Sequence, residues 1–95
     1  MIKDVKVEKL ALKQLKKAPV QVQMKFYAWV KMVTESGLMT VRRIPGFHDE
    51  PLTGKLKGFR SIRLNDQWRA FYTIASDGSI EFVQVKEVNA HEYKP

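Results

Sequence analysis

The chain has 95 residues, with 17 Lys and Arg against 10 Asp and Glu, no cysteine, and a formal net charge of +7. A chain of this length predicts one domain over residues 1–95 with one core, which leaves no room for a second domain or a large cofactor cradle. The lack of cysteine excludes a disulfide framework, a thiolate nucleophile and zinc bound by cysteine. No run approaches the roughly 18 apolar residues of a membrane span, and Met1–Asp4 lacks the apolar region of a secretion signal, so we expect a cytoplasmic protein.

The positive charge favours an anionic partner, which could be a nucleic-acid backbone, an acidic protein segment or both. Membrane attachment would need a basic amphipathic helix with an aromatic lipid face. Small soluble domains also carry such charges for colloidal reasons. Residues 1–50 hold 10 basic and 5 acidic side chains, net +5, and residues 51–95 hold 7 and 5, net +2. Most of the excess charge therefore lies in the half of the chain that predicts helices.

The first half of the chain predicts a short strand and two helices. Val5–Val7 alternates like an edge strand, and residues 8–17 form a short amphipathic helix with lysines outside. Pro19 suits the first turn of a longer helix, and Gly37 supplies its C-terminal stop. Apolar residues recur at helical spacing at Ala11, Leu12 and Leu15 in the first helix and at Val22, Phe26, Trp29, Val30 and Val33 in the second.

The second half predicts a long loop followed by strands. Residues 38–58 have no periodicity and collect prolines and glycines, which is typical of a functional loop. Three strand-like runs follow at 59–64, 67–74 and 80–88, separated by short turns, and these predict an antiparallel meander that Val5–Val7 could join. The expected fold class is α+β: a small twisted antiparallel sheet of three or four strands with the N-terminal αα-hairpin on one face.

The sequence contains none of the common enzyme motifs that we looked for. It lacks a P-loop and the GxGxxG, HExxH and GxSxG patterns, and two histidines without cysteine argue against a metal site, so we predict no cofactor and no metal. Acids, bases and cations without a metal suit phosphoryl transfer on RNA, where the 2′-OH is the nucleophile. The predicted fold would gather the candidates Glu50, Lys55, Lys57, Arg60, Arg63, Arg69, His91, Glu92 and Tyr93.

The turn between the first two runs decides whether two of these arginines share a face. A two-residue turn at Asn65-Asp66 would put Arg63 and Arg69 on opposite faces of the sheet. A three-residue loop over 65–67 would pair Arg63 with Arg69 and point both the same way. An active site that includes Arg63 requires the second register, and we predict the three-residue loop or a bulge.

Four blocks of the sequence resemble the RelE, HigB and YoeB toxins of type II toxin–antitoxin systems, in order and over essentially the whole chain. The blocks are Glu50–Gly54 (EPLTG), Gly58–Leu64 (GFRSIRL), Trp68–Tyr72 (WRAFY) and Val88–Tyr93 (VNAHEY). The resemblance implies a ribosome-dependent endoribonuclease that cuts mRNA in the A site of the 30S subunit. It also implies a cognate antitoxin protein, of helix-turn-helix or acidic-tail type, with DNA reached only through the antitoxin complex and no membrane involved.

The resemblance also implies roles for individual residues. It makes Glu50 the general base and Arg69 the arginine that faces the scissile phosphate, while His91 and Tyr93 match a C-terminal catalytic pair. Substrate contacts are expected from Lys57, Arg60, Arg63 and Glu92. The chain departs from the family at Thr53, where lysine is common, and at Lys94-Pro95, which extends the end.

Each of these residues also has a purely structural interpretation. Glu50 could be a solvated loop carboxylate, Arg69 could pair with Glu81 or Glu87 across the sheet, His91 could be a surface histidine, and Tyr93 could close the core. Two other functions are compatible with the sequence. One is a ParE-type inhibitor of DNA gyrase on the same fold, which needs no acid–base set, and the other is a non-catalytic basic RNA-binding module.

Overall fold

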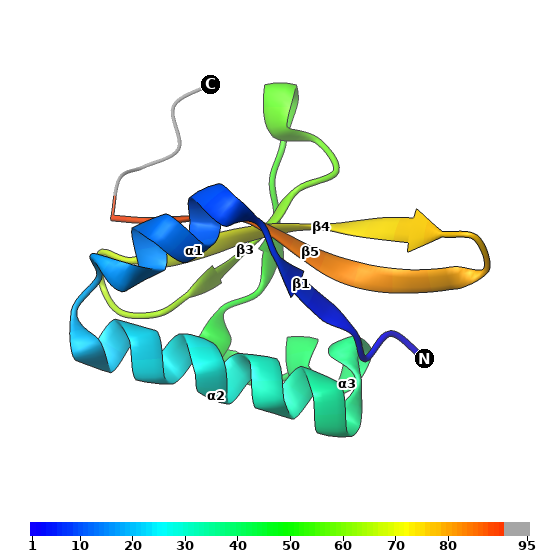
Figure 1. Ribbon diagram of the computed structural model, residues 1–95, viewed down its shortest axis with the longest axis horizontal. Coiled ribbons are helices and arrows are strands. Elements are labelled where there is room, and N and C mark those ends of the chain that lie inside the picture. Colours follow the sequence, from blue (N-terminus) through cyan, green and yellow to red (C-terminus); the bar gives the residue numbers. More distant parts are fainter. Residues whose placement is uncertain (91–95) are drawn as a thin grey trace.

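The computed structural model describes residues 1–90, which form a five-stranded sheet with helices packed against it (Figure 1). The strand order is β1-β5-β4-β3-β2, and β1 runs parallel to β5 while the other neighbours are antiparallel. No helix in this part of the chain is long and apolar enough to cross a membrane. The strands are β1 (Val5–Val7), β2 (Glu50–Pro51), β3 (Arg60–Arg63), β4 (Arg69–Asp77) and β5 (Ile80–Asn89), and the helices are α1 (Lys9–Lys16), α2 (Val20–Ser36), α3 (Leu38–Arg42) and two 3₁₀ helices, Pro45–Phe47 and Gly54–Leu56.

The helix predicted over 8–17 and the longer helix predicted between Pro19 and Gly37 are confirmed as α1 and α2. Their buried positions are those of the predicted stripes except Leu12, which is 37% exposed, and Val30, which is half-buried. α2 ends at Gly37, whose backbone has a φ of 88° and whose N–H donates to the Val33 carbonyl at 2.8 Å. A Cβ at this position would lie 2.8 Å from the Cγ of Met1, whose exposed side chain can move aside, so it is the left-handed backbone that favours glycine here.

The segment 38–58 is more ordered than its composition predicts. α3 occupies its start and buries Leu38 and Val41, and β2 pairs with β3 further along. Neither element has enough length to show a periodicity, and both are stabilised by tertiary contacts rather than by local propensity. Pro51 fits the edge position of β2 because an edge strand tolerates a residue without an N–H. The expectation of a wholly irregular loop is therefore wrong, and β2 is the strand that sequence patterning missed.

The register of the β3–β4 hairpin is the one that the candidate site requires. Arg63 lies opposite Arg69, and the Leu64 N–H donates to the Trp68 carbonyl at 2.8 Å, which closes a loop over 65–67. The Asn65 Oδ1 accepts hydrogen bonds from the backbone N–H groups of Gln67 and Trp68 at 2.8 and 2.6 Å. This side-chain cap explains why the loop takes three residues instead of two. The predicted register is confirmed.

A bulge in β5 determines which side chains face the helices. Phe71 lies opposite Glu87 while Tyr72 lies opposite Val85, so Lys86 is the extra residue. Val85 and Val88 consequently both enter the core, although they are three positions apart. The same bulge sends Lys86 and Glu87 together to the opposite side of the sheet.

The core lies between the helices and one face of the sheet. Trp29 of α2 and Tyr72 of β4 meet with ring centroids 5.5 Å apart, and Phe26 packs beside Trp29 at 6.0 Å. Burial of each such side chain stabilises the fold by about 1.5–3 kcal/mol. The strand residues on the helix side are Ile62, Leu64, Ala70, Tyr72, Val83, Val85 and Val88.

Candidate active site on the open face of the sheet

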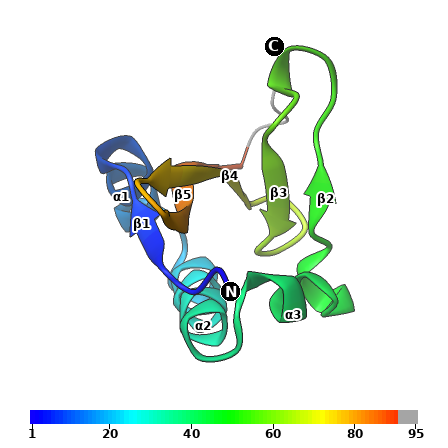
Figure 2. The same cartoon turned by 90° about the vertical axis from the view of Figure 1, so that its right-hand side faces the viewer.

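The face of the sheet opposite the helices, which we call the helix-free face, gathers polar residues from three adjacent strands. Glu50 of β2 lies opposite Ser61 of β3, and Arg63 of β3 lies opposite Arg69 of β4. Successive side chains of a strand point to opposite faces, so these four residues share the helix-free face while Ile62 between them faces the core. Figure 2 shows β2 and β3 rising side by side next to β4.

Glu50 and Arg69 converge on this face. The Arg69 Nη1 lies 3.7 Å from the Glu50 Oε1, and the two side chains are 29% and 48% exposed. An exposed pair of this length contributes about 0–1 kcal/mol, so neither group is locked in place. Of the alternative partners, Glu87 lies 3.5 Å from the Gln14 Nε2 instead, and the described residues show no ion pair between Arg69 and Glu81. The carboxylate and the guanidinium are therefore neighbours that a substrate phosphate could separate.

Two buried donors beside this pair lack partners. Ser61 is only 1% exposed, and within residues 1–90 neither its Oγ nor the Arg63 Nε has a hydrogen-bond partner. A buried polar group without a partner costs about 1–3 kcal/mol. Both groups lie on the helix-free face beside the Arg69 cation. An anionic oxygen bound here could accept hydrogen bonds from these donors and pair with the Arg69 cation.

Arg60 is turned away from Arg63 and Arg69. Its Nε donates to the Asp49 Oδ1 at 2.6 Å, and the Tyr72 hydroxyl donates to the Asp49 Oδ2 at 2.5 Å. The Asp49 side chain is 1% exposed. Burial and the hydrogen bond to Asp49 raise the pKa of Tyr72 to about 12. Arg60 was expected at the substrate, and the structure places it in this buried network on the helix side.

Asp49 and Tyr72 are residues whose roles sequence reasoning missed. Asp49 lies in the segment 38–58, where no pattern in the sequence distinguishes it from the other polar residues. The available signal was its adjacency to Glu50, because neighbouring residues in an extended segment point to opposite faces. Once Glu50 is placed on the helix-free face, Asp49 must point toward the core and needs a buried partner there.

The remaining predicted residues lie around or beyond this centre. Lys55 and Lys57 are exposed in the loop between β2 and β3, which projects above the sheet in Figure 1. His91, Glu92 and Tyr93 lie outside the described residues.

A hollow of about 510 Å³ lies beside β5, where the helix-free face meets the start of α1. Lysines and an aromatic ring are the side chains that would contact phosphates and bases of a single-stranded RNA. Lys86 is held there by the Glu8 Oε1, 3.1 Å from its Nζ. The hollow is lined by Glu8, Lys9, Leu10, Phe59, Lys86 and Glu87.

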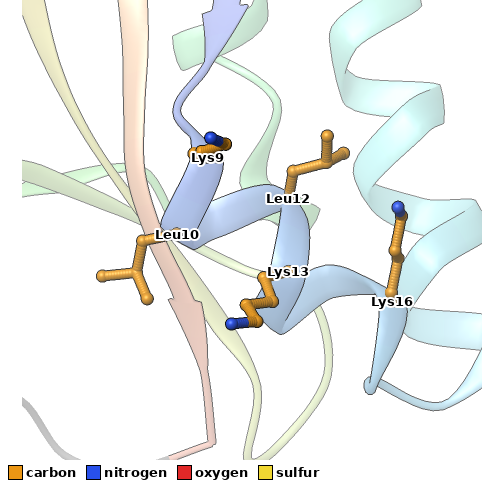
Figure 3. A pocket seen from close by; sticks show the side chains of 5 residues that line it. All are labelled: Lys9, Leu10, Leu12, Lys13 and Lys16. Atoms are coloured by element: carbon orange, nitrogen blue, oxygen red, sulfur yellow. The ribbon is translucent and has the colours of Figure 1, made fainter.

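A second surface covers the outer side of α1. Lys9, Lys13 and Lys16 form a stripe along the helix, flanked by Leu10, which is 53% exposed, and by Leu12 (Figure 3). These five residues, which we call the α1 surface, line an open hollow of about 580 Å³. The surface combines positive charge with exposed leucine side chains.

No protein-family model and no curated protein matches the chain. Solved structures do match it. A YoeB/ParE toxin from Agrobacterium tumefaciens is 17% identical, with 94% of this chain and 99% of that chain covered and a TM-score of 0.67. The Escherichia coli DinJ–YafQ toxin–antitoxin complex gives 17% identity, coverage of 96% and 94%, and a TM-score of 0.70. A chain of the RelBE2 toxin–antitoxin complex from Mycobacterium tuberculosis is 23% identical, with 93% of this chain and 96% of that chain covered and a TM-score of 0.57.

These similarities define the class of fold. The chain has the α+β fold of the RelE and YoeB toxins, over nearly its whole length. The fold class predicted from the sequence is therefore confirmed, and the resemblance predicted from four sequence blocks is confirmed at the level of the fold.

Proposed function

We propose that this protein is the toxin of a toxin–antitoxin pair and that it is an endoribonuclease acting on mRNA in the ribosomal A site. The observation that carries the proposal is the convergence of the Glu50 carboxylate and the Arg69 guanidinium, 3.7 Å apart, with Arg63 on the adjacent strand. A proton acceptor and two cations on one open face are the groups that cleavage of an RNA phosphodiester needs. The fold shared with YoeB, YafQ and RelE toxins supports the same conclusion.

The proposed reaction uses the RNA itself as nucleophile. Glu50 accepts the proton of the 2′-OH, the 2′-oxygen attacks phosphorus, and the bond from phosphorus to the 5′-oxygen breaks. The products are a 2′,3′-cyclic phosphate and a 5′-hydroxyl, so the reaction consumes no water and uses no metal. Arg69 and Arg63 donate hydrogen bonds to the phosphoryl oxygens, on which negative charge increases in the transition state.

The leaving 5′-oxygen needs a proton. We assign this step to His91, because the ordinary pKa of histidine lies near 6.5 and lets the imidazolium donate at neutral pH. Tyr93 completes the C-terminal part of the site in this proposal. Both assignments rest on the resemblance of the block Val88–Tyr93 to the toxins.

The net positive charge of the molecule supports the ribosome as its proposed site of action. The chain carries +7, and only Arg63 and Arg69 are assigned to the reacting phosphate. The other cations are available to contact ribosomal RNA, whose backbone supplies a salt-dependent attraction. The substrate is thus mRNA held on a polyanionic surface rather than free RNA.

Substitution of Arg69 tests the proposed activity. We expect R69A to slow cleavage of ribosome-bound mRNA by about 10²–10³-fold, because it removes a preorganised cation from the transition state. E50Q should cause a loss of about 10²-fold or more, because the amide cannot take the proton. The matched control is R43A, an exposed arginine outside the site.

The assay follows mRNA fragments and growth arrest after expression of each variant. Arrest that persists in R69A and E50Q would contradict the proposal. Arrest accompanied by inhibited DNA supercoiling and intact mRNA would replace the proposed activity with gyrase inhibition.

We also propose an acidic antitoxin as the partner of the α1 surface. The solved DinJ–YafQ and RelBE2 structures are complexes of a toxin with an antitoxin. On this chain, three lysines beside exposed leucines match an amphipathic segment that carries carboxylates and apolar side chains. An RNA partner would be complementary to the lysines but not to the exposed leucines.

A further inference from the structure

The strand that carries Glu50 is weakly attached to the sheet by its backbone. β2 has two residues, at the edge of the sheet, and Pro51 has no N–H to donate. The next backbone bond along the chain runs from the Leu52 N–H to the Phe59 carbonyl at 2.9 Å. His48, just before this segment, has a left-handed backbone with a φ of 50°. Backbone pairing alone therefore gives Glu50 little positional precision.

The residue beside Glu50 supplies a much firmer attachment. The Asp49 carboxylate is 1% exposed and accepts one hydrogen bond on each oxygen, at 2.6 Å from the Arg60 Nε and 2.5 Å from the Tyr72 hydroxyl. Hydrogen bonds to an ionised carboxylate are about twice as strong as neutral ones. Tyr72 itself is fully buried and packs on Trp29. Asp49 is thus anchored to a fully buried part of the core.

We propose that Asp49 is a positioning residue that holds the Glu50 carboxylate against Arg69 on the opposite face of the sheet. Asp49 directly precedes β2, and its carboxylate binds on the helix side while Glu50 lies on the helix-free face, so fixing Asp49 fixes where the backbone enters β2 and hence the direction of Glu50. The exposed pair of Glu50 and Arg69 at 3.7 Å is too weak to set this geometry itself. The inference rests on the proposed function, in which Glu50 is the general base.

A double-mutant cycle of D49N and E50Q separates positioning from a general loss of structure. D49N should reduce the single-turnover rate of mRNA cleavage on the ribosome by about tenfold or more, because a displacement of about 1 Å at a reacting group has effects of this size. The toxin concentration for half-saturation should change by less than about twofold. In the E50Q background D49N should have less than about a twofold effect, because the group it positions is already inactive.

An equal loss in both backgrounds, or no loss in the wild-type background, would overturn the proposal. D77N, which changes an exposed aspartate at the β4–β5 turn, is the matched control and should leave the rate unchanged. If D49N does not fold, Tyr72→Phe keeps the test possible, because it removes one of the two hydrogen bonds of Asp49 and leaves Arg60 in place. Tyr72→Phe should reduce the cleavage rate less than D49N does, and this reduction should likewise disappear in the E50Q background.

A measurement without RNA distinguishes this proposal from the proposed function. In a ¹⁵N-labelled protein, nuclear Overhauser effects between the Arg69 guanidinium protons and the Glu50 side chain report their proximity. We expect these signals to be lost in D49N while the cross-strand signals between Arg63 and Arg69 remain. Retention of the Glu50–Arg69 signals in folded D49N would overturn the positioning role. A wild-type protein that shows them but cleaves no mRNA would overturn only the proposed function.

Discussion

At the scale of single residues, Asp49 and Glu50 show how one backbone places two neighbouring carboxylates in opposite environments. The Asp49 side chain is 1% exposed and accepts a hydrogen bond on each oxygen, whereas the Glu50 side chain is 48% exposed and lies 3.7 Å from the Arg69 Nη1. The buried carboxylate is held by donors and is unavailable for chemistry. The exposed carboxylate is accessible from solvent, as its proposed role as a general base requires.

The buried network should make stability depend on pH through Tyr72. Its pKa is raised to about 12 in the folded protein, first by burial and then by the hydrogen bond to Asp49, against an ordinary value of 10.0. A raised pKa stabilises the folded state fully below the unfolded value, and this contribution is lost as the pH rises from about 10 to about 12. The contribution lost is about 3 kcal/mol, from two pKa units at about 1.4 kcal/mol each.

Denaturant unfolding of the wild-type protein and Tyr72→Phe, followed from pH 8 to pH 11.5, measures this effect. The comparison removes the titration of the other tyrosines and lysines, which both proteins share. We expect the stability advantage of the wild-type protein to shrink above pH 10. An advantage that stays constant over the whole range would contradict the assigned environment of Tyr72.

Individual site residues could be predicted where their spacing in the sequence determines which face of the sheet they occupy. Arg63 and Arg69 could be placed together because a three-residue loop after Leu64 sets the register, and the Asn65 cap enforces that loop. The same register places Arg60 on the opposite face, because it stands three positions before Arg63 in one strand, so its expected substrate contact conflicts with the predicted loop. Its partner Asp49, 11 residues away in a segment without periodicity, could not be predicted. Buried ion pairs between distant segments leave no local pattern in a sequence.

At the scale of elements, α1 and α2 were predictable and β2 was not, for the same physical reason. A helix of 17 residues such as α2 repeats its apolar face several times, so the pattern is visible. β2 and α3 have 2 and 5 residues, too few for a repeat, and they exist because of what they pack against. Glu50 lies in one of these short elements, so the sequence singled out the residue but not the strand that carries it.

The α1 surface carries a prediction at this scale. Charge reversal by K13E places a carboxylate in the middle of the lysine stripe and should weaken binding of the cognate antitoxin by about tenfold, with slower association. Lys31, exposed on α2, gives the matched control K31E with the same change in net charge. Surface plasmon resonance at two salt concentrations measures both variants. Equal weakening by K13E and K31E would show that only net charge matters and would exclude a defined docking surface.

At the scale of the whole molecule, charge and chemistry are separated. The net charge of +7 is concentrated in residues 1–50, at +5, while the arginines of the candidate site lie on β3 and β4. A molecule with this charge distribution can bind a polyanion through many dispersed cations, while only a few arginines lie at the candidate site. The composition predicted an anionic partner without saying which cations contact it, and the sheet register shows that Arg63 and Arg69 share one face.

The proposed reaction begins when the 2′-OH of the RNA attacks its own phosphodiester, with Glu50 as the base. It is tested most directly with ribosome-bound mRNA that carries a single 2′-deoxynucleotide on the 5′ side of the scissile phosphate. We predict that the wild-type protein cleaves the all-ribose mRNA to a 2′,3′-cyclic phosphate and a 5′-hydroxyl and leaves the deoxy-substituted mRNA intact. Cleavage of both messages at equal rates would contradict the account.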